Sequence, residues 1–281
     1  MGQFQIKKIG HILAAILNAA LKVLVIFLIA YPFIWMVLTS FKPYKETTVY
    51  PPTMLPHTWT TEGYTQALEM VDVPLFLKNS LIVSFAVLIL QYIVIIPAAY
   101  GFARCRFRFK NLFFGIVLLG FMIPQQVTFI PIYLMFSKAG ILQSLLPQIL
   151  PFIANAFGIF LLRQYFMQIP EEIIEAARLD DAGEFKIILR IMIPMARPAI
   201  FTIGLLSFIS SWNSYFWALI MTTKEAYRTL PIGVAMLNSQ EGGRLWNVLM
   251  AGNMFLVVPI LIVYLFANKQ IRKAFAYSGI K

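Results

Sequence analysis

The sequence predicts an all-α, polytopic membrane protein with six transmembrane helices. The 281 residues are 60% hydrophobic and have a mean hydropathy of +0.77. Only 12% of them are charged, whereas a soluble globular domain carries about 25%. The apolar residues also gather in stretches of about 20, which is the length that crosses a bilayer as a helix. These three observations favour a single membrane-embedded domain.

Six segments have the length and composition of a span. We expect them at 17–39, 79–103, 111–136, 142–166, 199–220 and 248–268. The apolar stretch that leads into the first span is too long for the core of a cleaved signal peptide. Residues 1–16 are therefore expected to form a cytoplasmic segment with a short interfacial helix. Residues 17–268 would form the six-span domain, and residues 269–281 a cytoplasmic tail.

The third and fourth spans contain prolines at the expected membrane depth, namely Pro124, Pro147 and Pro151. A proline inside a helix leaves a backbone carbonyl without its usual partner, and lipid cannot supply one. We expect these kinks to face protein or a water-filled cavity.

Lysine and arginine are distributed unevenly between the connections. Fifteen of the 23 lie in the N-terminal segment, the second and fourth connections and the C-terminal tail, whereas seven lie in the other connections. Because cytoplasmic loops carry the excess of positive charge, we expect both termini and the fourth connection in the cytoplasm. The polar connections at about 40–78 and 221–247 would then face outward. This placement accounts for the formal charge of +11, so we expect no nucleic-acid partner.

Several kinds of chemistry are missing from the sequence. None of the 12 acidic residues lies in an expected span, and His11 and His57 lie near or outside the membrane faces. Ion-driven carriers often keep such a group at membrane depth as a relay. No G-x-x-x-x-G-K-[ST] motif is present to cradle ATP, and no catalytic constellation supports an enzyme. A single cysteine, Cys105, excludes an intrachain disulfide and argues against a thiolate metal site; we expect no metal.

The fourth connection holds an acidic segment at 170–194, which reads PEEIIEAARLDDAGEFKIILRIMIP and contains half of the acids of the chain. Pro170 suits the first position of a helix. Residues 180–183 have turn chemistry, with Gly183 able to adopt a positive φ. The apolar residues that follow resume a helix, which is expected to stop before Pro194. The apolar side of the first helix is expected to consist of Ile173, Ile174, Ala177 and Leu179.

Two interpretations of this segment are open. An interfacial amphipathic helix would leave its acidic face in solvent. A docking surface for another protein would use the shallow face that Ala176 and Ala177 leave. Acidic residues are poorly placed beside an anionic inner leaflet, which favours docking.

The order of residues in the segment resembles the EAA loop of ABC-importer permeases. The matching residues are Glu175-Ala176-Ala177, then Gly183 and Ile191-x-Ile193-Pro194. In that family the loop is where the membrane subunit meets its cytoplasmic ATPase. The family usually has glycine directly after the first aspartate, where this chain has Asp181. The resemblance implies ATPase coupling by Glu175, Ala176, Ala177, Asp180, Asp181, Gly183, Phe185 and Pro194.

The resemblance extends over nearly the whole chain, including YPFIWMVLTSFKP at 31–43 and PAAYGFARCRFRFKN at 97–111. These segments are similar to carbohydrate-importer permeases of the maltose-transporter type, second-subunit class. The resemblance implies the type I, MetI-like permease fold. In the similar proteins the basic tail reaches into the ATPase dimer, which implies that contact for Gly279 and Lys281.

The resemblance also implies a heteromeric importer in the bacterial cytoplasmic (inner) membrane. A second, homologous permease subunit would complete the pathway. Two cytoplasmic ABC ATPase subunits would bind ATP and Mg²⁺, and an extracytoplasmic solute-binding protein would deliver the substrate. This chain would hold no cofactor and have no enzyme activity of its own, and membrane lipid would surround its spans.

Sugars are bound by amides and charged groups, with aromatic rings packed on the apolar face of the sugar. Candidates at the expected membrane depth are Gln125, Gln126, Asn155, Ser211, Trp212, Asn213, Tyr215 and Trp217. The alternative for these residues is an aromatic belt or polar contacts between helices. Candidates for contact with the binding protein are Asn238, Gln240, Glu241, Gly242 and Gly243. The alternative there is a flexible loop.

The first hypothesis is thus a permease subunit of an ATP-driven, binding-protein-dependent importer of a sugar or oligosaccharide, coupled to its ATPase through the EAA-like loop. A glycerol-phosphate or polyol importer belongs to the same class. An ion-coupled secondary carrier and a membrane scaffold without transport belong to other classes. The missing carboxylate at membrane depth weighs against the ion-coupled carrier.

Overall fold

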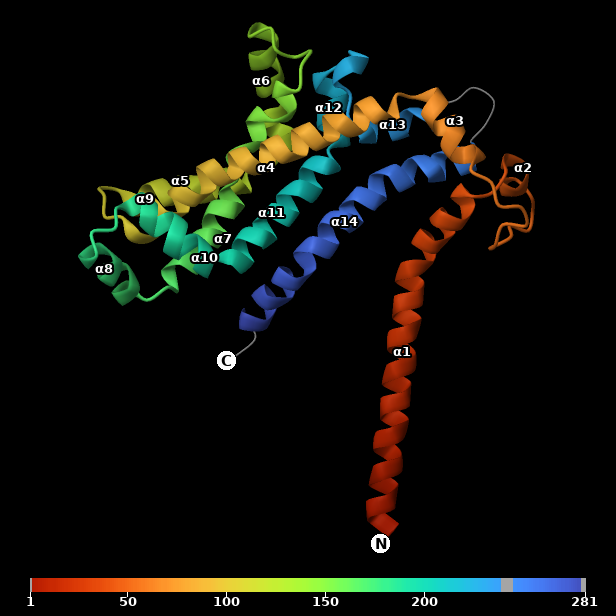
Figure 1. Ribbon diagram of the computed structural model, residues 1–281, viewed down its shortest axis with the longest axis horizontal. Coiled ribbons are helices and arrows are strands. Elements are labelled where there is room, and N and C mark those ends of the chain that lie inside the picture. Colours follow the sequence, from red (N-terminus) through yellow and green to blue (C-terminus); the bar gives the residue numbers. More distant parts are fainter. Residues whose placement is uncertain (1, 239–244, 279–281) are drawn as a thin grey trace. The chain divides into compact units, whose positions relative to one another are not determined.

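The computed structural model describes the backbone of residues 2–238 and 245–278, and the side chains of residues 15–238 and 245–268. All regular structure in these residues is helical, as Figure 1 shows. The chain forms two compact units. The first consists of the residues up to Val71 together with Met236–Phe255, and the second consists of Asp72–Ala235 and the residues from Leu256 onward.

The first unit contains α1, α2, α3 and the beginning of α14. Their bounds are Gly2–Ser40 for α1, Tyr44–Thr47 for α2, Glu62–Met70 for α3 and Trp246–Ser278 for the whole of α14. The first span is confirmed as an apolar helix over Ala15–Ser40. Helix α1 runs without a break from Gly2 into the first span, and the interfacial position expected for residues 1–16 stays a prediction. No proline interrupts α1 before Pro32, so nothing forces the helix to end before the first span.

Residues around Tyr64 tie α3 to the ends of α1 and α14 within this unit. The Tyr64 hydroxyl lies 2.8 Å from the Ser40 hydroxyl, and the Tyr64 ring packs on Phe41 and Phe255 at centroid distances of 5.2 and 5.9 Å. A Cβ on Gly63 would lie 2.7 Å from a backbone oxygen of α14. Only glycine therefore allows this close approach of the backbones.

A buried lysine organises the loop that follows α1. Lys42 is 2% exposed and donates to the carbonyl and the hydroxyl of Thr53. Burial lowers the pKa of Lys42, while attraction to Glu46 opposes that shift. Glu46 in turn accepts from the Thr53 hydroxyl and the His57 amide, at 3.0 Å each. Burial tends to raise the pKa of Glu46, but these hydrogen bonds outweigh it, so the pKa lies below its usual value.

The second unit contains the remaining helices. Their bounds are α4 Val73–Arg104, α5 Lys110–Met122, α6 Gln125–Lys138, η1 Leu146–Gln148, η2 Leu150–Phe152, α7 Ala156–Met167, α8 Glu171–Leu179, α9 Glu184–Ile187, the π-helix η3 Ile188–Met192, α10 Ile193–Met195, α11 Arg197–Trp212, α12 Tyr215–Met221, η4 Glu225–Tyr227, α13 Leu230–Met236 and the C-terminal part of α14.

Four helical segments of the described chain are long and apolar enough to cross a membrane, and two bent helix pairs bring the number to six if each pair is one span. The second and sixth spans are confirmed as the continuous helices α4 and α14. The expected kink at Pro124 is a break of 96° between α5 and α6. Ile123, the residue before that proline, is extended, as the steric clash with a following proline requires.

The fourth and fifth spans are not single α-helices. Pro147 and Pro151 lie in the 3₁₀ turns η1 and η2, because proline lacks the amide that an α-helix needs. The fifth span ends at Trp212 and resumes at Tyr215. The Asn213 side chain donates to the carbonyl of Ile209, and such local bonds compete with the helix ladder.

The core of the second unit lies where α4 packs on α7 and α11. Ile95, Ala99, Leu162, Phe166 and Ile203 belong to one buried cluster, each at most 2% exposed. The helices approach closely because small residues stand at the contact, a usual feature of packing in membranes. The core thereby fixes α4, α7 and α11 relative to one another, and all three helices supply residues to the cavity described below.

We predict that Gly204→Ala destabilises this core. A Cβ at position 204 would lie 2.1 Å from the Tyr92 hydroxyl, which donates to the carbonyl of Ile200 at 2.7 Å. Overpacking of this kind costs about 1–3 kcal/mol, which thermal unfolding of the purified protein measures. Gly115→Ala is the matched control, since nothing lies within 4 Å of its Cβ and it gains helix propensity of about 1 kcal/mol. Equal transitions for both variants would contradict the prediction.

Candidate functional site

The acidic segment begins with a helix, as expected, but Pro170 is the N-cap and not the first helical residue. Helix α8 starts at Glu171, directly after Pro170. Its buried side is narrower than expected, because only Ile174 is fully buried, in the same core cluster as Ile187 of α9. Leu179 is 86% exposed, so its expected place on the packed side is wrong. The apolar contact of α8 with the core therefore consists of Ile174 and the partly buried Ala177, rather than of a broad face.

The turn after α8 differs from the expectation in one respect. The residue with a positive φ is Asp181, at 55°, whereas Gly183 has a φ of −64° and precedes α9. The Asp181 amide donates to Arg178 at 3.1 Å and the Ala182 amide to Ala177 at 3.0 Å. This is the pair of bonds that defines a Schellman helix end. Aspartate can adopt the left-handed conformation because its short side chain bonds locally.

The second half of the segment continues past the proline at which it was expected to stop. The π-helix η3 precedes α10, and Pro194 lies in the first turn of α10. A proline clashes with the carbonyl four residues earlier. The wider π-turn, in which the Ile193 amide donates to Ile188, relieves that crowding. The helix therefore reaches Met195, and the chain turns at Ala196.

Two polar anchors fix the segment to neighbouring helices. Arg104 of α4 pairs with Glu171, and it also donates to the carbonyls of Phe166, at 2.6 Å, and Ile169. Tyr100 of α4 donates to Glu184. Arg178 of α8 pairs with the same carboxylate at 3.1 Å. Desolvation lowers the pKa of Arg178, but attraction to Glu184 outweighs it and raises that pKa.

The opposite side of the segment is open to solvent and partly apolar. Glu175, Ala176, Asp180 and Asp181 are exposed. Phe185 is 75% exposed, next to the acidic turn. Large apolar side chains this exposed beside a polar rim are typical of a protein interaction surface. The sequence analysis did not assign Leu179 to this exposed surface. It placed Leu179 on the apolar side of the first helix, because the residue follows Ile173, Ile174 and Ala177 at helical spacing.

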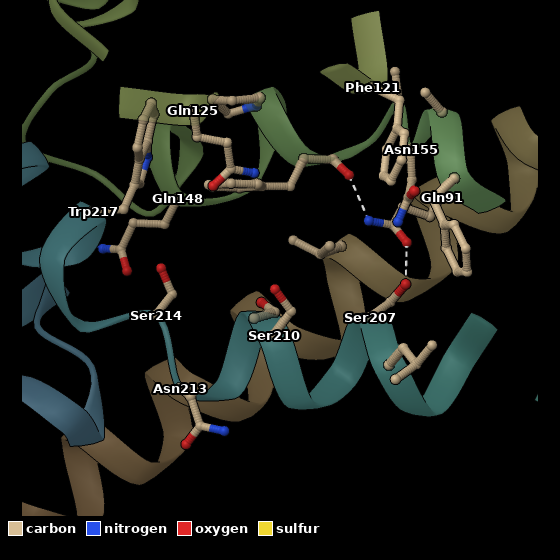
Figure 2. A pocket seen from close by; sticks show the side chains of 18 of the residues that line it. Gln91, Phe121, Gln125, Gln148, Asn155, Ser207, Ser210, Asn213, Ser214 and Trp217 are labelled. Carbon is tan, nitrogen blue, oxygen red and sulfur yellow. Dashed lines mark hydrogen bonds between the residues drawn. The ribbon is translucent and has the colours of Figure 1, made fainter. Parts of the chain in front are cut away.

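A second feature is a cavity of about 830 Å³ in the second unit. Seven of the eight predicted substrate-pathway residues line it, namely Gln125, Gln126, Asn155, Ser211, Asn213, Tyr215 and Trp217. Figure 2 shows Gln125 entering from one side, with Ser207, Ser210 and Ser214 on the other. Polar lining residues that the sequence analysis missed are Gln91, Gln148, Ser207, Ser210 and Ser214. No charged side chain is among the described residues that line the cavity.

Trp212 is the predicted pathway residue that lies elsewhere. It is 1% exposed and stacks on Phe208 at a centroid distance of 5.6 Å. Its indole N–H donates to the carbonyl of Leu256 in α14 at 3.0 Å. Trp212 therefore packs α11 against α14 and does not line the cavity.

The cavity wall is held by side chains that bond to irregular backbone. Gln91 donates to the carbonyl of Phe152 at 2.6 Å and accepts from the Ser207 hydroxyl at 2.5 Å (Figure 2). Trp217 donates to the carbonyl of Pro147 at 2.7 Å. The missed Gln91 could have been noticed as an amide in the middle of an apolar span, where such groups need a partner.

The other predicted site residues fall at the edges of the described chain. Asn238 is exposed. Gln240, Glu241, Gly242, Gly243, Gly279 and Lys281 lie outside the described residues. Across the part of the chain that the structure describes, no three His, Cys, Asp or Glu residues gather as a metal site would require.

Comparison with known proteins identifies the class of protein. Residues 91–276 match the family described as the binding-protein-dependent transport system inner membrane component. The chain belongs to this family of ABC-importer permeases. It is thus a multi-pass inner-membrane transport component and not an enzyme.

Similar proteins come from several bacteria. A probable ABC transporter permease of Bacillus subtilis is 32% identical over 90% of this chain and 84% of its own length. The arabinooligosaccharide transport permease AraQ of Halalkalibacterium halodurans is 28% identical over 91% of this chain and 92% of its own. The sn-glycerol-3-phosphate transport permease UgpE of Yersinia pestis is 32% identical over 69% of this chain and 70% of its own length.

A solved structure shares the fold. A crystal structure of a bacterial ABC transporter involved in the import of the acidic polysaccharide alginate matches with a TM-score of 0.81 and 26% identity, over 91% of this chain and 95% of that one. The expectation of a MetI-like permease fold is confirmed.

We predict that Asp181→Gly stabilises the turn after α8. Glycine adopts a φ of 55° without the cost that a side chain incurs, so the gain should be about 0.5–1 kcal/mol. Hydrogen–deuterium exchange of the Ala182 amide should slow by a factor of about two to five. Gly183→Ala is the matched control and should leave exchange unchanged, because its φ is ordinary and nothing lies within 4 Å of its Cβ. The reverse pattern would mean that Gly183 is the hinge.

Proposed function

We propose that this chain is the permease subunit of an ATP-driven importer of a neutral sugar or oligosaccharide. The observation that carries the proposal is the lining of the cavity of about 830 Å³, which consists of amides, hydroxyls and aromatic rings without a charged group. Amides and hydroxyls can replace the hydrogen bonds that a sugar makes to water, while aromatic rings cover its apolar face. The relative named for arabinooligosaccharides supports a neutral saccharide, and the structure named for the acidic polysaccharide alginate supports a saccharide but not its neutrality.

The uncharged lining of the cavity also favours one substrate over another within this class of importer, namely a neutral saccharide over a glycerol phosphate. The relative named for sn-glycerol-3-phosphate transports an anion, and a phosphate is usually recognised by arginine or lysine. A charged substrate would need such a group from the companion subunit. A neutral saccharide needs none, and we therefore prefer it.

The function requires partners. We propose a second, homologous permease that completes the pathway, an extracytoplasmic binding protein that delivers the sugar, and two cytoplasmic ATPase subunits that bind ATP and Mg²⁺. This chain would hold no cofactor, and both of its termini would lie in the cytoplasm. The family description, which names binding-protein-dependent transport, supports the binding protein.

The ATPase would dock on α8 and the turn that follows it. The exposed apolar side chains Leu179 and Phe185 would fill a groove of the ATPase, and Glu175 would pair with a basic residue there. The two anchors from Arg104 and Tyr100 make the segment move together with α4. Closure of the ATPase dimer would then reach α4 as a rigid-body displacement.

The test of the proposed function is purification of the tagged chain from its host in mild detergent. We expect a second six-span protein and an ATPase to be recovered with it, and ATP hydrolysis to rise with the sugar-loaded binding protein. Uptake in ATP-supplied vesicles should resist uncouplers. A chain that purifies alone, and whose uptake collapses with uncouplers, would instead be an ion-coupled carrier.

We predict that Glu175→Lys abolishes uptake although the protein inserts in normal amount. The exposed carboxylate would become a positive charge at the ATPase contact, and like charges at an interface cost several kcal/mol. Sugar uptake and recovery of the ATPase are measured together. Glu69→Lys, the same change at an exposed position of α3, should transport normally. Normal uptake by Glu175→Lys would exclude the coupling role.

We also predict that Gln125→Leu lowers sugar uptake about tenfold, which corresponds to the ~1.4 kcal/mol expected for a hydrogen bond to a neutral ligand. The change keeps the size of the side chain and removes its amide. Gln168→Leu, the same change at an exposed position beyond α7, is the control. Equal uptake by both variants would remove Gln125 from the pathway.

A further inference from the structure

The connection between α4 and α5 alternates basic and aromatic residues. Residues 104–110, which we call the basic loop, read RCRFRFK. A hollow of about 520 Å³ beside this loop is lined only by residues of the range 105–112. None of these residues lines the cavity of about 830 Å³, so the hollow is separate from the proposed transport pathway.

Two arginines of the basic loop present positive charge that nothing in the described chain neutralises. Arg106 and Arg108 are both exposed, and the ion pairs among the described residues involve other arginines. Neither side chain makes a hydrogen bond with another described residue, although the Arg108 guanidinium lies 4.8 Å from the centroid of the Phe109 ring. Residues 73–170 contain no Asp or Glu, so no acid close in sequence can pair with these arginines.

A third cation lines the hollow from the start of α5. The Lys110 ammonium donates to the carbonyls of Ala103 and Cys105 at 3.3 and 3.0 Å, which uses two of its three donors. Arg106 lines the hollow too, and all of its donors are open. Guanidinium and ammonium groups are the usual partners of a phosphate in proteins.

The basic loop also exposes aromatic rings. Phe107 is 43% exposed and Phe109 is 57% exposed. Phe109 adopts a φ of 62°, a conformation that a residue with a large side chain rarely takes. Aromatic rings are enriched at the level of the lipid headgroups. Rings that alternate with cations are therefore typical of a segment that binds an anionic membrane surface.

An exposed apolar stripe leads from the hollow along α5. Leu112 lines the hollow, and Leu112, Ile116 and Leu119 are 61%, 54% and 62% exposed. Their spacing of three or four residues places them on one face of the helix. A free phosphate would leave this stripe uncovered. A phospholipid carries a phosphate and acyl chains in one molecule, and it can cover the cations and the stripe together.

We propose that the basic loop binds the headgroup of an anionic phospholipid, with Arg106 and Lys110 on its phosphate, Arg108 at its edge and its acyl chains along α5. The site goes beyond the proposed function, because its occupation requires neither sugar nor ATP. The loop begins at Arg104, which pairs with Glu171 of α8, so the bound lipid would lie at the same end of the second unit as the acidic segment.

The test measures protection of an introduced thiol by the lipid. Asn111→Cys in a Cys105→Ser background places one thiol of this chain on the wall of the hollow. The full-length chain, with the subunits that purify with it, is reconstituted in nanodiscs of phosphatidylcholine alone or with about a third of phosphatidylglycerol. Labelling of this chain by uncharged N-ethylmaleimide is followed by mass spectrometry. We expect phosphatidylglycerol to slow labelling about fivefold, as an occupied-to-empty ratio of about four gives.

A double variant makes the result specific. Arg106→Gln with Arg108→Gln should lose nearly all of the protection, because each basic residue near an anionic surface strengthens binding roughly fivefold and the pair therefore about 25-fold. Lys138→Gln with Lys224→Gln makes the same change of charge at exposed positions outside the loop and should keep the protection.

Two further controls separate the lipid from other causes. Gln168→Cys is exposed and lies at the same end of the second unit, between the two carbonyls that Arg104 contacts. It should label at the same rate in both lipids, which removes a general effect of surface charge on thiol reactivity. Inorganic phosphate added to nanodiscs of phosphatidylcholine should leave the labelling of position 111 unchanged.

The proposal is overturned if phosphatidylglycerol does not slow labelling at position 111, if position 168 is slowed equally, or if the double arginine variant is protected as well as the parent. Equal protection by inorganic phosphate would overturn it in favour of a site for free anions. A position 111 that fails to label even in phosphatidylcholine would overturn it by showing that the loop is covered. Because labelling needs neither ATP nor transport, these outcomes are independent of whether the chain imports a sugar.

Discussion

The packing of α4 against α7 and α11 is the contact on which the rest of the second unit depends. The buried cluster that contains Ile95, Ala99, Leu162 and Ile203 holds α4 at a fixed register. On one side of this cluster α4 carries Gln91, which lines the cavity. On the other it carries Arg104, which pairs with α8. The two positions are 13 residues apart, or about 20 Å along a helix, so one continuous helix connects the cavity to the proposed ATPase contact.

The broken helices around the cavity follow from the requirement that backbone groups in a membrane be satisfied within the protein. Proline turns at Pro147 and Pro151 expose carbonyls, and nearby side chains cover them. The Trp217 indole bonds to the carbonyl of Pro147, and Gln91 bonds to that of Phe152. The same side chains that stabilise the irregular backbone also line the cavity, which explains why a polar cavity forms where the helices are interrupted.

In the acidic segment, an aspartate stands where the family usually has glycine, and the end of α8 still has the hydrogen bonds of a Schellman motif. The left-handed residue is Asp181, at the position directly after the first aspartate, where the family usually has glycine. The helix end keeps both of its characteristic bonds. Aspartate tolerates that conformation, so the direction in which α9 leaves α8 does not depend on glycine at Gly183.

The sequence by itself determined the all-α membrane class, the positions of the apolar segments and the acidic helix after Pro170, because these depend on composition and local periodicity. Seven of the eight residues that it predicts for the substrate pathway line the cavity, since polar and aromatic residues of this kind are rare in apolar spans. Tertiary structure alone decided the rest. The burial of Trp212 depends on α14, and the exposure of Leu179 depends on how little of α8 meets the core.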